Sequence, residues 1–232
     1  DFETIAKLRK YPDNVKPGRF LFKNGMSAFQ QVSSLRHNMP VHLAFNNQER
    51  MENVAQRIAQ EIEADSTSIM KAVNDSIFLQ KNNFNKETVM AIFIPNSYEM
   101  YWNTSAEKLR DKMLDEYHKF WNAERLAKAK KLNLTPQQVV TLAAIVHKES
   151  VKKDERPKIA KVYLNRLEQG MPLQADPTVI YSEKLKDNDF NQVIKRVTPE
   201  ILRNNTPYNT YIITGLPPGP IAMPDIDAID AV

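Results

Sequence analysis

The sequence predicts an α+β fold with a helical centre. Only five glycines occur in 232 residues, and none lies between Gly25 and Gly170. Apolar residues recur in this stretch at the three- and four-residue spacing of amphipathic helices. Short β-branched and aromatic stretches occur in the first hundred residues, whereas nine of the 14 prolines lie between Pro157 and Pro224. We therefore expect a few short strands before the helical centre and a loop-rich part after it.

The N-terminal part is predicted to alternate extended and helical segments. Extended stretches are expected at residues 19–22 and 41–45. Between them, the turn Asn24-Gly25-Met26-Ser27 precedes a helix through Leu35. A third strand is expected at residues 89–95, because turn residues follow it at Pro95-Asn96-Ser97.

Two long amphipathic helices are predicted over residues 50–70 and 105–129. The apolar positions that support them are Val54, Ile58, Ile62 and Ile69 in the first, and Leu109, Met113, Tyr117, Phe120 and Leu126 in the second. Both patterns place apolar side chains on one helical face, so each helix is expected to pack with that face on the core.

The last hundred residues carry clear helix boundaries. Thr135-Pro136-Gln137-Gln138 is a capping-box start, and its helix is expected to run to about Ser150. A second helix is expected from residue 154 to Gly170, a typical C-terminal glycine. A short helix at 199–203 and a strand at 208–214 should follow. The Pro-Pro-Gly-Pro run at 217–220 offers too few N–H donors for a phosphate loop and is interpreted as a rigid wall.

Composition excludes several kinds of chemistry. The chain has no cysteine, and its four histidines lack metal-ligand spacing, so we expect no metal site and no organic cofactor. The net charge of +4 is spread along the chain, which argues against nucleic acid as a partner. The longest apolar stretch, residues 139–146, is too short to cross a bilayer, and no signal peptide is visible.

Glu149 is the first candidate for catalysis. At 100° per residue, it falls on the apolar side of its helix with Leu142 and Val146. Partial desolvation there should raise the pKa of the carboxyl group toward neutrality, as a general acid requires. Alternatively, Glu149 reaches solvent at the helix end or pairs with Lys152 or Lys153.

A second carboxylate is the usual glycosidase requirement, and Asp176 is the best local candidate. Asp176-Pro177-Thr178 also has the pattern of a turn or helix cap in which the aspartate accepts backbone hydrogen bonds. One acid/base group is sufficient if the substrate supplies its own nucleophile. Both one-carboxylate and two-carboxylate chemistry therefore remain open at this point.

Further polar residues are candidates for binding a sugar. Tyr208-Asn209-Thr210-Tyr211 alternates aromatic and polar side chains, which is typical of a strand with one face in a groove or of an ordinary half-buried strand. Asn165, Arg166 and Gln174 are additional groove candidates. Arg166 could equally be an ion-pair partner inside the domain.

Three blocks between residues 135 and 222 carry a family resemblance. Their most specific parts are Ile145-Val146-His147-Lys148-Glu149-Ser150, Gln174-Ala175-Asp176-Pro177-Thr178 and Thr206-Pro207-Tyr208-Asn209-Thr210-Tyr211. In this order they resemble the YceG-like family, the endolytic murein transglycosylases known as MltG. That resemblance implies cleavage inside peptidoglycan glycan strands, at the bond between N-acetylmuramic acid and N-acetylglucosamine, leaving 1,6-anhydro ends.

The resemblance also implies roles for single residues. The first block usually contains two glutamates in this family, and the second is catalytic. His147 replaces the first here, which leaves Glu149 as the candidate. The positions that match the family's cleft are Gln174, Asp176 and Asn209, accompanied by Tyr208 and Tyr211. No metal or organic cofactor is implied.

Residues 20–35 and 41–74 resemble the family's LysM-like region more loosely. We therefore predict an N-terminal LysM-like region at 1–85 and a YceG-like catalytic domain at 86–232. The family resemblance implies a bacterial envelope protein held in the cytoplasmic membrane by an anchor outside this chain, with this part on the periplasmic face. Glycan strands are the expected partner, and peptidoglycan synthases are a further one.

Two other functions compete with the transglycosylase. One is a peptidoglycan hydrolase in which Asp176 positions water as the second carboxylate. The other is a binding or scaffolding module without catalysis, in which His147 marks lost activity.

Overall fold

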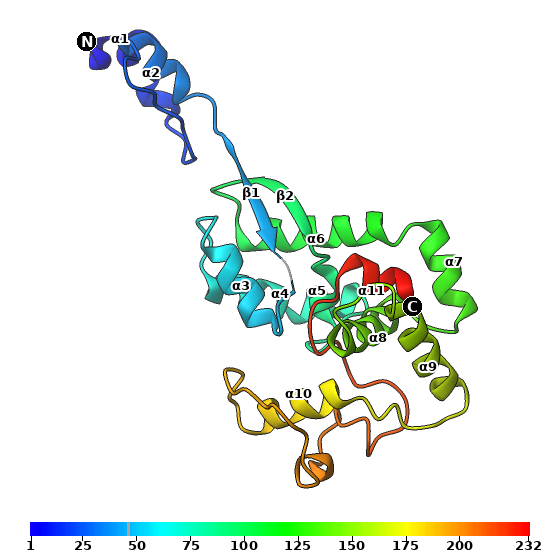
Figure 1. Ribbon diagram of the computed structural model, residues 1–232. Coiled ribbons are helices and arrows are strands. Elements are labelled where there is room, and N and C mark those ends of the chain that lie inside the picture. Colours follow the sequence, from blue (N-terminus) through cyan, green and yellow to red (C-terminus); the bar gives the residue numbers. More distant parts are fainter. Residues whose placement is uncertain (46) are drawn as a thin grey trace.

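The computed structural model describes residues 1–45 and 47–232, which contain many helices, connecting loops and one small sheet at an edge of the main body (Figure 1). This mixture confirms the predicted α+β class. The strands are β1 (Pro40–Phe45) and β2 (Asn96–Tyr101). The α-helices are α1 (Phe2–Leu8), α2 (Ala28–Ser34), α3 (Met51–Ala59), α4 (Ser66–Val73), α5 (Ser76–Lys81), α6 (Ala106–Phe120), α7 (Ala123–Lys131), α8 (Pro136–Glu149), α9 (Arg156–Glu168), α10 (Asp176–Lys186) and α11 (Ile226–Ala231). The short 3-10 helices are η1 (Pro12–Asn14), η2 (Val89–Ile92) and η3 (Ile201–Arg203).

The sheet consists of β1 and β2 in antiparallel pairing, with Pro40 opposite Tyr101 and Phe45 opposite Asn96. Along β1 buried and exposed residues alternate, as expected for a strand with one face on the core. The predicted strand at 41–45 is therefore confirmed.

Two other predicted strands are wrong. Residues 19–22 are not a strand: Leu21 and Phe22 are exposed, so no core face holds an extended segment there. Residues 89–95 form η2 and an irregular end instead of a strand, and β2 begins only at Asn96. Consecutive residues from Val89 to Ile94 are all buried, so this segment lacks the alternation of a strand with one solvent face.

Each of the two long predicted helices is interrupted. The first is divided into α3 and α4, because Asp65 caps a new helix by accepting a hydrogen bond from the Ser68 N–H at 2.6 Å. The second ends at Phe120, and Asn122 starts α7 by accepting from the Arg125 N–H at 3.0 Å. The apolar periodicity continues across both breaks, so periodicity alone predicted one helix where caps start a second.

Helices α8 and α9 agree with the prediction. Thr135 and Gln138 form the capping box of α8, and Gly170 has the positive φ of +66° expected after α9. Helix α8 lies between two apolar clusters: Val139, Val140 and Ala143 belong to the larger, whereas Leu142, Ala144, Ile145 and Val146 belong to the smaller. The helix is thereby held from two sides, and the residues nearest its C-terminal end pack in the smaller cluster.

Residues 208–214 form turns, so the predicted strand there is wrong. The carbonyl of Asn209 accepts from the N–H groups of Ile212 and Ile213, at 3.1 and 3.0 Å, and these local bonds fold the segment back on itself. The short helix predicted at 199–203 is present as the 3-10 turn η3.

The larger apolar cluster extends from Val41 to Ile229 and so includes residues on both sides of the expected boundary at 85 and 86. Helices α1 and α2 lie apart from it, at the far end of the molecule (Figure 1). The domain division and the LysM-like character of the first part remain predictions. Across residues 1–45 and 47–232, no helix has both the length and the apolar character needed to cross a membrane.

Candidate active site

Glu149 ends α8 and is exposed as a residue, but its carboxylate is partly shielded from solvent where it accepts a hydrogen bond from the Tyr163 hydroxyl at 3.3 Å. Tyr163 is itself buried on α9, so a fixed donor holds one oxygen of this carboxylate. Burial raises the pKa of the Tyr163 hydroxyl above its ordinary value, and the neighbouring Glu149 raises it further. Tyr163 therefore stays protonated and donates over the physiological pH range.

Asp176 begins α10, and its carboxylate accepts a hydrogen bond from the Tyr211 hydroxyl at 2.6 Å. The alternative in which Asp176 caps a helix is not what the structure shows, because Asp176 is the first helical residue and Ala175 occupies the cap. Desolvation, followed by the hydrogen bond to Asp176, raises the pKa of Tyr211 to about 12.

Glu149 and Asp176 are close enough for their charges to interact. The pKa of Glu149 lies above its ordinary value, mainly because burial disfavours the charged form and then because Asp176 repels it. The hydrogen bond from Tyr163 acts in the opposite direction. A carboxyl group that holds its proton more tightly is suited to general acid catalysis.

The two lysines that could neutralise Glu149 are engaged elsewhere. Lys152 pairs with Glu155 at 3.1 Å, and Lys153 pairs with Asp227. Among the described residues, Glu149 takes part in no ion pair. The ion-pair alternative for Glu149 is thus not the arrangement observed.

Arg166 shapes the loop that leads to Asp176. Its guanidinium donates to the carbonyls of Pro172 and Leu173, at 3.1 and 2.9 Å, and to the side-chain oxygen of Gln174 at 3.0 Å. Gln174 is exposed and adopts a positive φ of +55°, a conformation that these contacts help to hold. Arg166 thus binds backbone and amide oxygens rather than an acidic partner.

Tyr208 and Asn209 lie below the surface. Tyr208 is buried, with its ring 4.9 Å from that of Tyr181. Asn209 is fully buried and donates to the carbonyls of Leu202 and Asn204, at 3.0 and 2.7 Å. Both therefore support the turn that carries Tyr211 instead of lining an open surface.

Asn165 is half-buried on α9, beside Arg166 in the chain. In the part of the chain that the structure describes, no hydrogen bond joins its side chain to the carboxylates or to the two tyrosine hydroxyls. The structure thus brings together Glu149, Asp176, Tyr211, Gln174 and Arg166, and the place of Asn165 in this group stays a prediction.

Two buried threonines, which the sequence analysis did not select, join the segments that carry the site. Thr210 accepts from the Ala175 N–H at 3.0 Å, and its hydroxyl shares a 2.8 Å hydrogen bond with the Thr178 hydroxyl. Tyr163 is a further site residue that the sequence analysis did not select. A tyrosine at a buried position needs a partner for its hydroxyl, and this was the available signal.

His147 lies in a second polar cluster at the same end of α8. Its ring nitrogens lie 3.1 Å from the Arg156 guanidinium and 3.0 Å from the Asn47 amide. Arg156 is 2% exposed, pairs with Asp225 at 3.4 Å and donates to the carbonyl of Ser150 at 3.3 Å. Burial lowers the pKa of His147 despite the opposing effect of Asp225.

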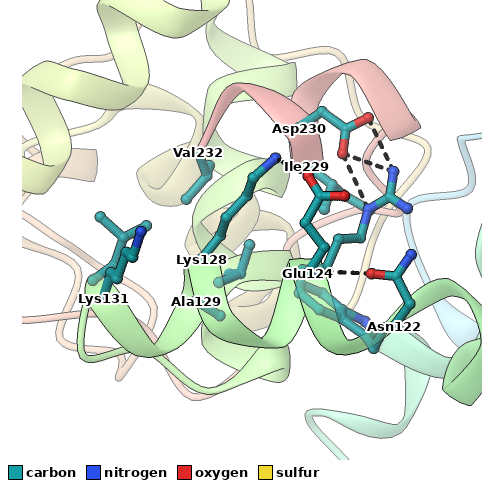
Figure 2. Close-up of a pocket in the computed structure, with 12 residues that line it drawn as sticks. Asn122, Glu124, Lys128, Ala129, Lys131, Ile229, Asp230 and Val232 are labelled. Atoms are coloured by element: carbon teal, nitrogen blue, oxygen red, sulfur yellow. Dashed lines mark hydrogen bonds and ion pairs between the residues drawn. The ribbon is translucent and has the colours of Figure 1, made fainter.

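A cavity of about 690 Å³ lies between α7, α8 and α11, away from Glu149. Figure 2 shows charged side chains around it, among them Lys128, Glu124 and Asp230. Lys128 pairs with Glu124 at 2.8 Å, and Asp230 pairs with Arg125 at 2.9 Å. In the described residues, no group of three or more histidine or acidic side chains is arranged to hold a metal ion.

Comparisons with known proteins agree with the sequence resemblance. A relative from Bacillus subtilis named endolytic murein transglycosylase is 38% identical over 121 residues, which are 52% of this chain and 31% of the relative. One of the same name from Streptococcus pneumoniae is 34% identical over 139 residues, 59% of this chain and 24% of the relative. The matched region thus spans less than a third of either relative.

A solved structure shows the same fold. The crystal structure of a yceG-like protein from Listeria monocytogenes aligns with 99% of this chain and 80% of its own, with a TM-score of 0.69 and 23% sequence identity. The YceG-like family itself matches residues 1–232, the whole sequence. The chain therefore belongs to the YceG-like family.

Proposed function

We propose that this chain is the catalytic part of an endolytic peptidoglycan lytic transglycosylase with Glu149 as its acid/base. The main support is the position of Glu149, a partly desolvated carboxyl group held by Tyr163 beside a second carboxylate. Relatives named endolytic murein transglycosylase supply the substrate class. The substrate is the glycan strand, cut between N-acetylmuramic acid and N-acetylglucosamine.

In the first step the Glu149 carboxyl group donates its proton to the glycosidic oxygen, and the bond between this oxygen and C1 of the muramoyl residue breaks. The acetamido oxygen of the same sugar stabilises the positive charge at C1. In the second step the Glu149 carboxylate removes the proton of the C6 hydroxyl, whose oxygen bonds to C1. Glu149 is protonated again, no water is consumed, and a 1,6-anhydro end results.

The neighbouring groups have distinct parts in this mechanism. Tyr163 fixes one oxygen of Glu149, which leaves the other free to face the sugar. Asp176 raises the proton affinity of Glu149 and is itself oriented by Tyr211. Exposed Gln174 is positioned by Arg166 to contact sugar hydroxyl or acetamido groups.

The interaction between Asp176 and Glu149 also favours a second candidate, a muramidase that uses both carboxylates. In that case Asp176 would position a water molecule that attacks C1. The two candidates differ in their products, since hydrolysis adds one water and leaves a reducing muramic acid.

The test is mass spectrometry of the products formed from purified glycan strands by the wild-type chain and by Glu149→Gln. Products lighter by one water than hydrolysed ends, formed only by wild type, are the expected result. Hydrated ends together with an inactive Asp176→Asn variant would establish the muramidase. Binding to sacculi without soluble product from any variant would leave a non-catalytic peptidoglycan-binding module.

The wider setting is also a proposal. We infer a bacterial envelope protein, anchored in the cytoplasmic membrane by a segment outside this chain, which acts beside peptidoglycan synthases. Within residues 1–85, the β1 to α4 segment contributes to the larger apolar cluster, so we propose that this LysM-like region places bound glycan relative to residues 86–232.

A further inference from the structure

A second hollow lies at the opposite end of α8 from Glu149. Its volume is about 670 Å³, within the range of small-molecule sites. It is formed by the segment after α5, the first turn of α8, the last turn of α9 and the segment that begins at Gly215. We call it the amide groove, because Asn83, Asn85, Gln137 and Gln138 line it.

The chemistry of the amide groove differs from that of the cavity in Figure 2. Five charged side chains line that cavity, namely Glu124, Arg125, Lys128, Lys131 and Asp230. Among the described residues that line the amide groove, none is charged. Amides and threonine hydroxyls both donate and accept hydrogen bonds, and Leu216, Pro217 and Pro218 add apolar surface. This combination suits a neutral ligand with many hydroxyl and amide groups.

The walls of the groove are fixed in advance. A Cβ atom at Gly219 would lie 2.1 Å from the carbonyl oxygen of Glu87, so these two backbone segments touch and only glycine fits. Asn85 and Thr88 exchange hydrogen bonds at 2.9 and 2.8 Å, and Gln137 donates to the Asn83 carbonyl at 3.4 Å. A preformed site loses little entropy when it binds a ligand.

The groove is linked to the candidate active site by short stretches of chain. Gln138 and Glu149 are separated by three turns of α8, about 16 Å along its axis. Arg166 donates a hydrogen bond to Gln174, and Leu167, which follows Arg166 in the chain, lines the groove. Tyr211, which binds Asp176, precedes Gly215 at the groove by four residues. Several linked sugar units can bridge this separation, whereas one sugar cannot.

We propose that the amide groove binds a saccharide unit of the same glycan strand, several units away from the bond that Glu149 cleaves. This inference rests on the proposed function for the identity of the strand. The groove then favours long strands over short ones, because only a long strand fills both places. That preference provides a physical basis for cutting within a strand.

Binding is best measured with the full chain carrying Glu149→Gln, so that no cleavage intervenes. The probes are long peptide-free glycan strands and a short N-acetylglucosamine oligomer. Gln137→Trp fills the groove and Gln137→Ala removes one amide. The matched control is Asn191→Trp, at an exposed amide residue after α10 that lies outside both the groove and residues 1–85. Thermal unfolding of each variant verifies that it is folded.

We expect Gln137→Trp to weaken binding of long strands roughly tenfold and Gln137→Ala roughly threefold, with the short oligomer and the control unchanged. Unchanged long-strand binding by folded Gln137→Trp would overturn the inference, as would an equal loss for both probes. If the wild-type chain cleaves no strand but the groove variants still weaken binding, the proposed function is contradicted and the inference about the groove is not.

Discussion

Two polar clusters at the C-terminal end of α8 differ in charge balance although their central residues, His147 and Glu149, are two positions apart. On one side Glu149 interacts with Asp176, and the hydroxyls of tyrosines are their hydrogen-bond partners. On the other side the guanidinium of Arg156 contacts both His147 and Asp225, and these two side chains also lie 3.3 Å from each other. The first cluster is acidic without an ion pair among the described residues, whereas the second contains its own counter-ion.

Under the proposed function, the first cluster carries the chemistry and the second supports the structure. Burial first, and then repulsion by Asp176, make the Glu149 carboxyl group hold its proton more tightly, so that it can donate this proton. A buried arginine paired with a carboxylate stabilises one arrangement of the elements that carry them. Arg156 also binds the carbonyl of Ser150, the residue after Glu149, and thereby fixes the helix end.

The largest expected effect is on activity, from Glu149→Gln. The amide cannot donate or accept the transferred proton, so strand cleavage should fall about a thousandfold or more. Because the pKa of Glu149 is raised in the folded chain, ionisation of its carboxyl group favours the unfolded chain. The contribution of Glu149 to the free energy of unfolding is fully present below the ordinary pKa of a glutamate and is lost as pH rises through the pKa of Glu149 in the folded chain. The glutamine variant should therefore be at least as stable as wild type at neutral pH.

Product release from glycan strands and thermal unfolding measure these two effects. Glu168→Gln, at an exposed glutamate on α9, is the matched control and should retain full activity. Cleavage by Glu149→Gln at a rate near that of wild type would remove the distinction between the two clusters.

The second effect is on stability, from Arg156→Met. This change leaves Asp225 and the Ser150 carbonyl without their buried donor, and the free energy of unfolding should fall by about 3 kcal/mol. Urea unfolding measures it, with the more exposed Arg57→Met as control. A loss no larger than that of the control would show that the second cluster does not support the helix end.

The sequence predicted one of these clusters better than the other, for a physical reason. The partial desolvation of Glu149 follows from its helical face, a local property, and the raised pKa agrees with it. The contact of Arg156 with Asp225 joins residues 69 positions apart, and no periodicity predicts it. The helix breaks at Asp65 and Asn122 were also missed. Both residues are of types that cap helices, but the apolar helical spacing continues across them and predicts one helix instead of two.

The strand predicted at residues 208–214 is wrong for a related reason. Its alternation of aromatic and polar residues is typical of a strand, yet the alternation has another origin here. Tyr208 and Asn209 are buried in the fold, whereas Tyr211 reaches Asp176. Alternation predicts a strand only where a partner strand is available, and the pairing of distant segments is not encoded locally.

The third effect is a pair of opposite shifts in the pH dependence of cleavage. Cleavage should decline at high pH where Glu149 loses its proton, and this decline is the alkaline limb of the pH–rate profile. Asp176→Asn removes the repulsion that helps to raise the pKa of Glu149, so the alkaline limb should move to lower pH. Tyr163→Phe removes the hydrogen bond that lowers this pKa, so the same limb should move to higher pH. Both variants should keep some activity, with losses of about threefold to tenfold.

Rates of strand cleavage across the pH range measure both shifts. Tyr117→Phe controls for the loss of a phenol hydroxyl, because Tyr117 is a buried tyrosine in the larger apolar cluster, away from the acidic cluster. Shifts in the same direction for both variants would contradict the electrostatic account of the acidic cluster. Complete inactivity of Asp176→Asn would instead favour the two-carboxylate hydrolase.

The smallest effect concerns the second cluster and comes from His147→Gln. Burial lowers the pKa of His147, with Arg156 and Lys148 acting in the same direction and Asp225 in the opposite one. The unfolded chain therefore binds a proton more readily, and wild-type stability should fall as pH decreases from the ordinary histidine value near 6.5 toward the folded value. Glutamine has no such proton, so the variant should lose less stability over this interval.

Urea unfolding on both sides of pH 6.5 measures the difference, with the exposed His118→Gln as control. Equal pH dependence in wild type and His147→Gln would mean that the histidine beside the buried arginine is not held neutral, and the charge balance assigned to the second cluster would then be incorrect.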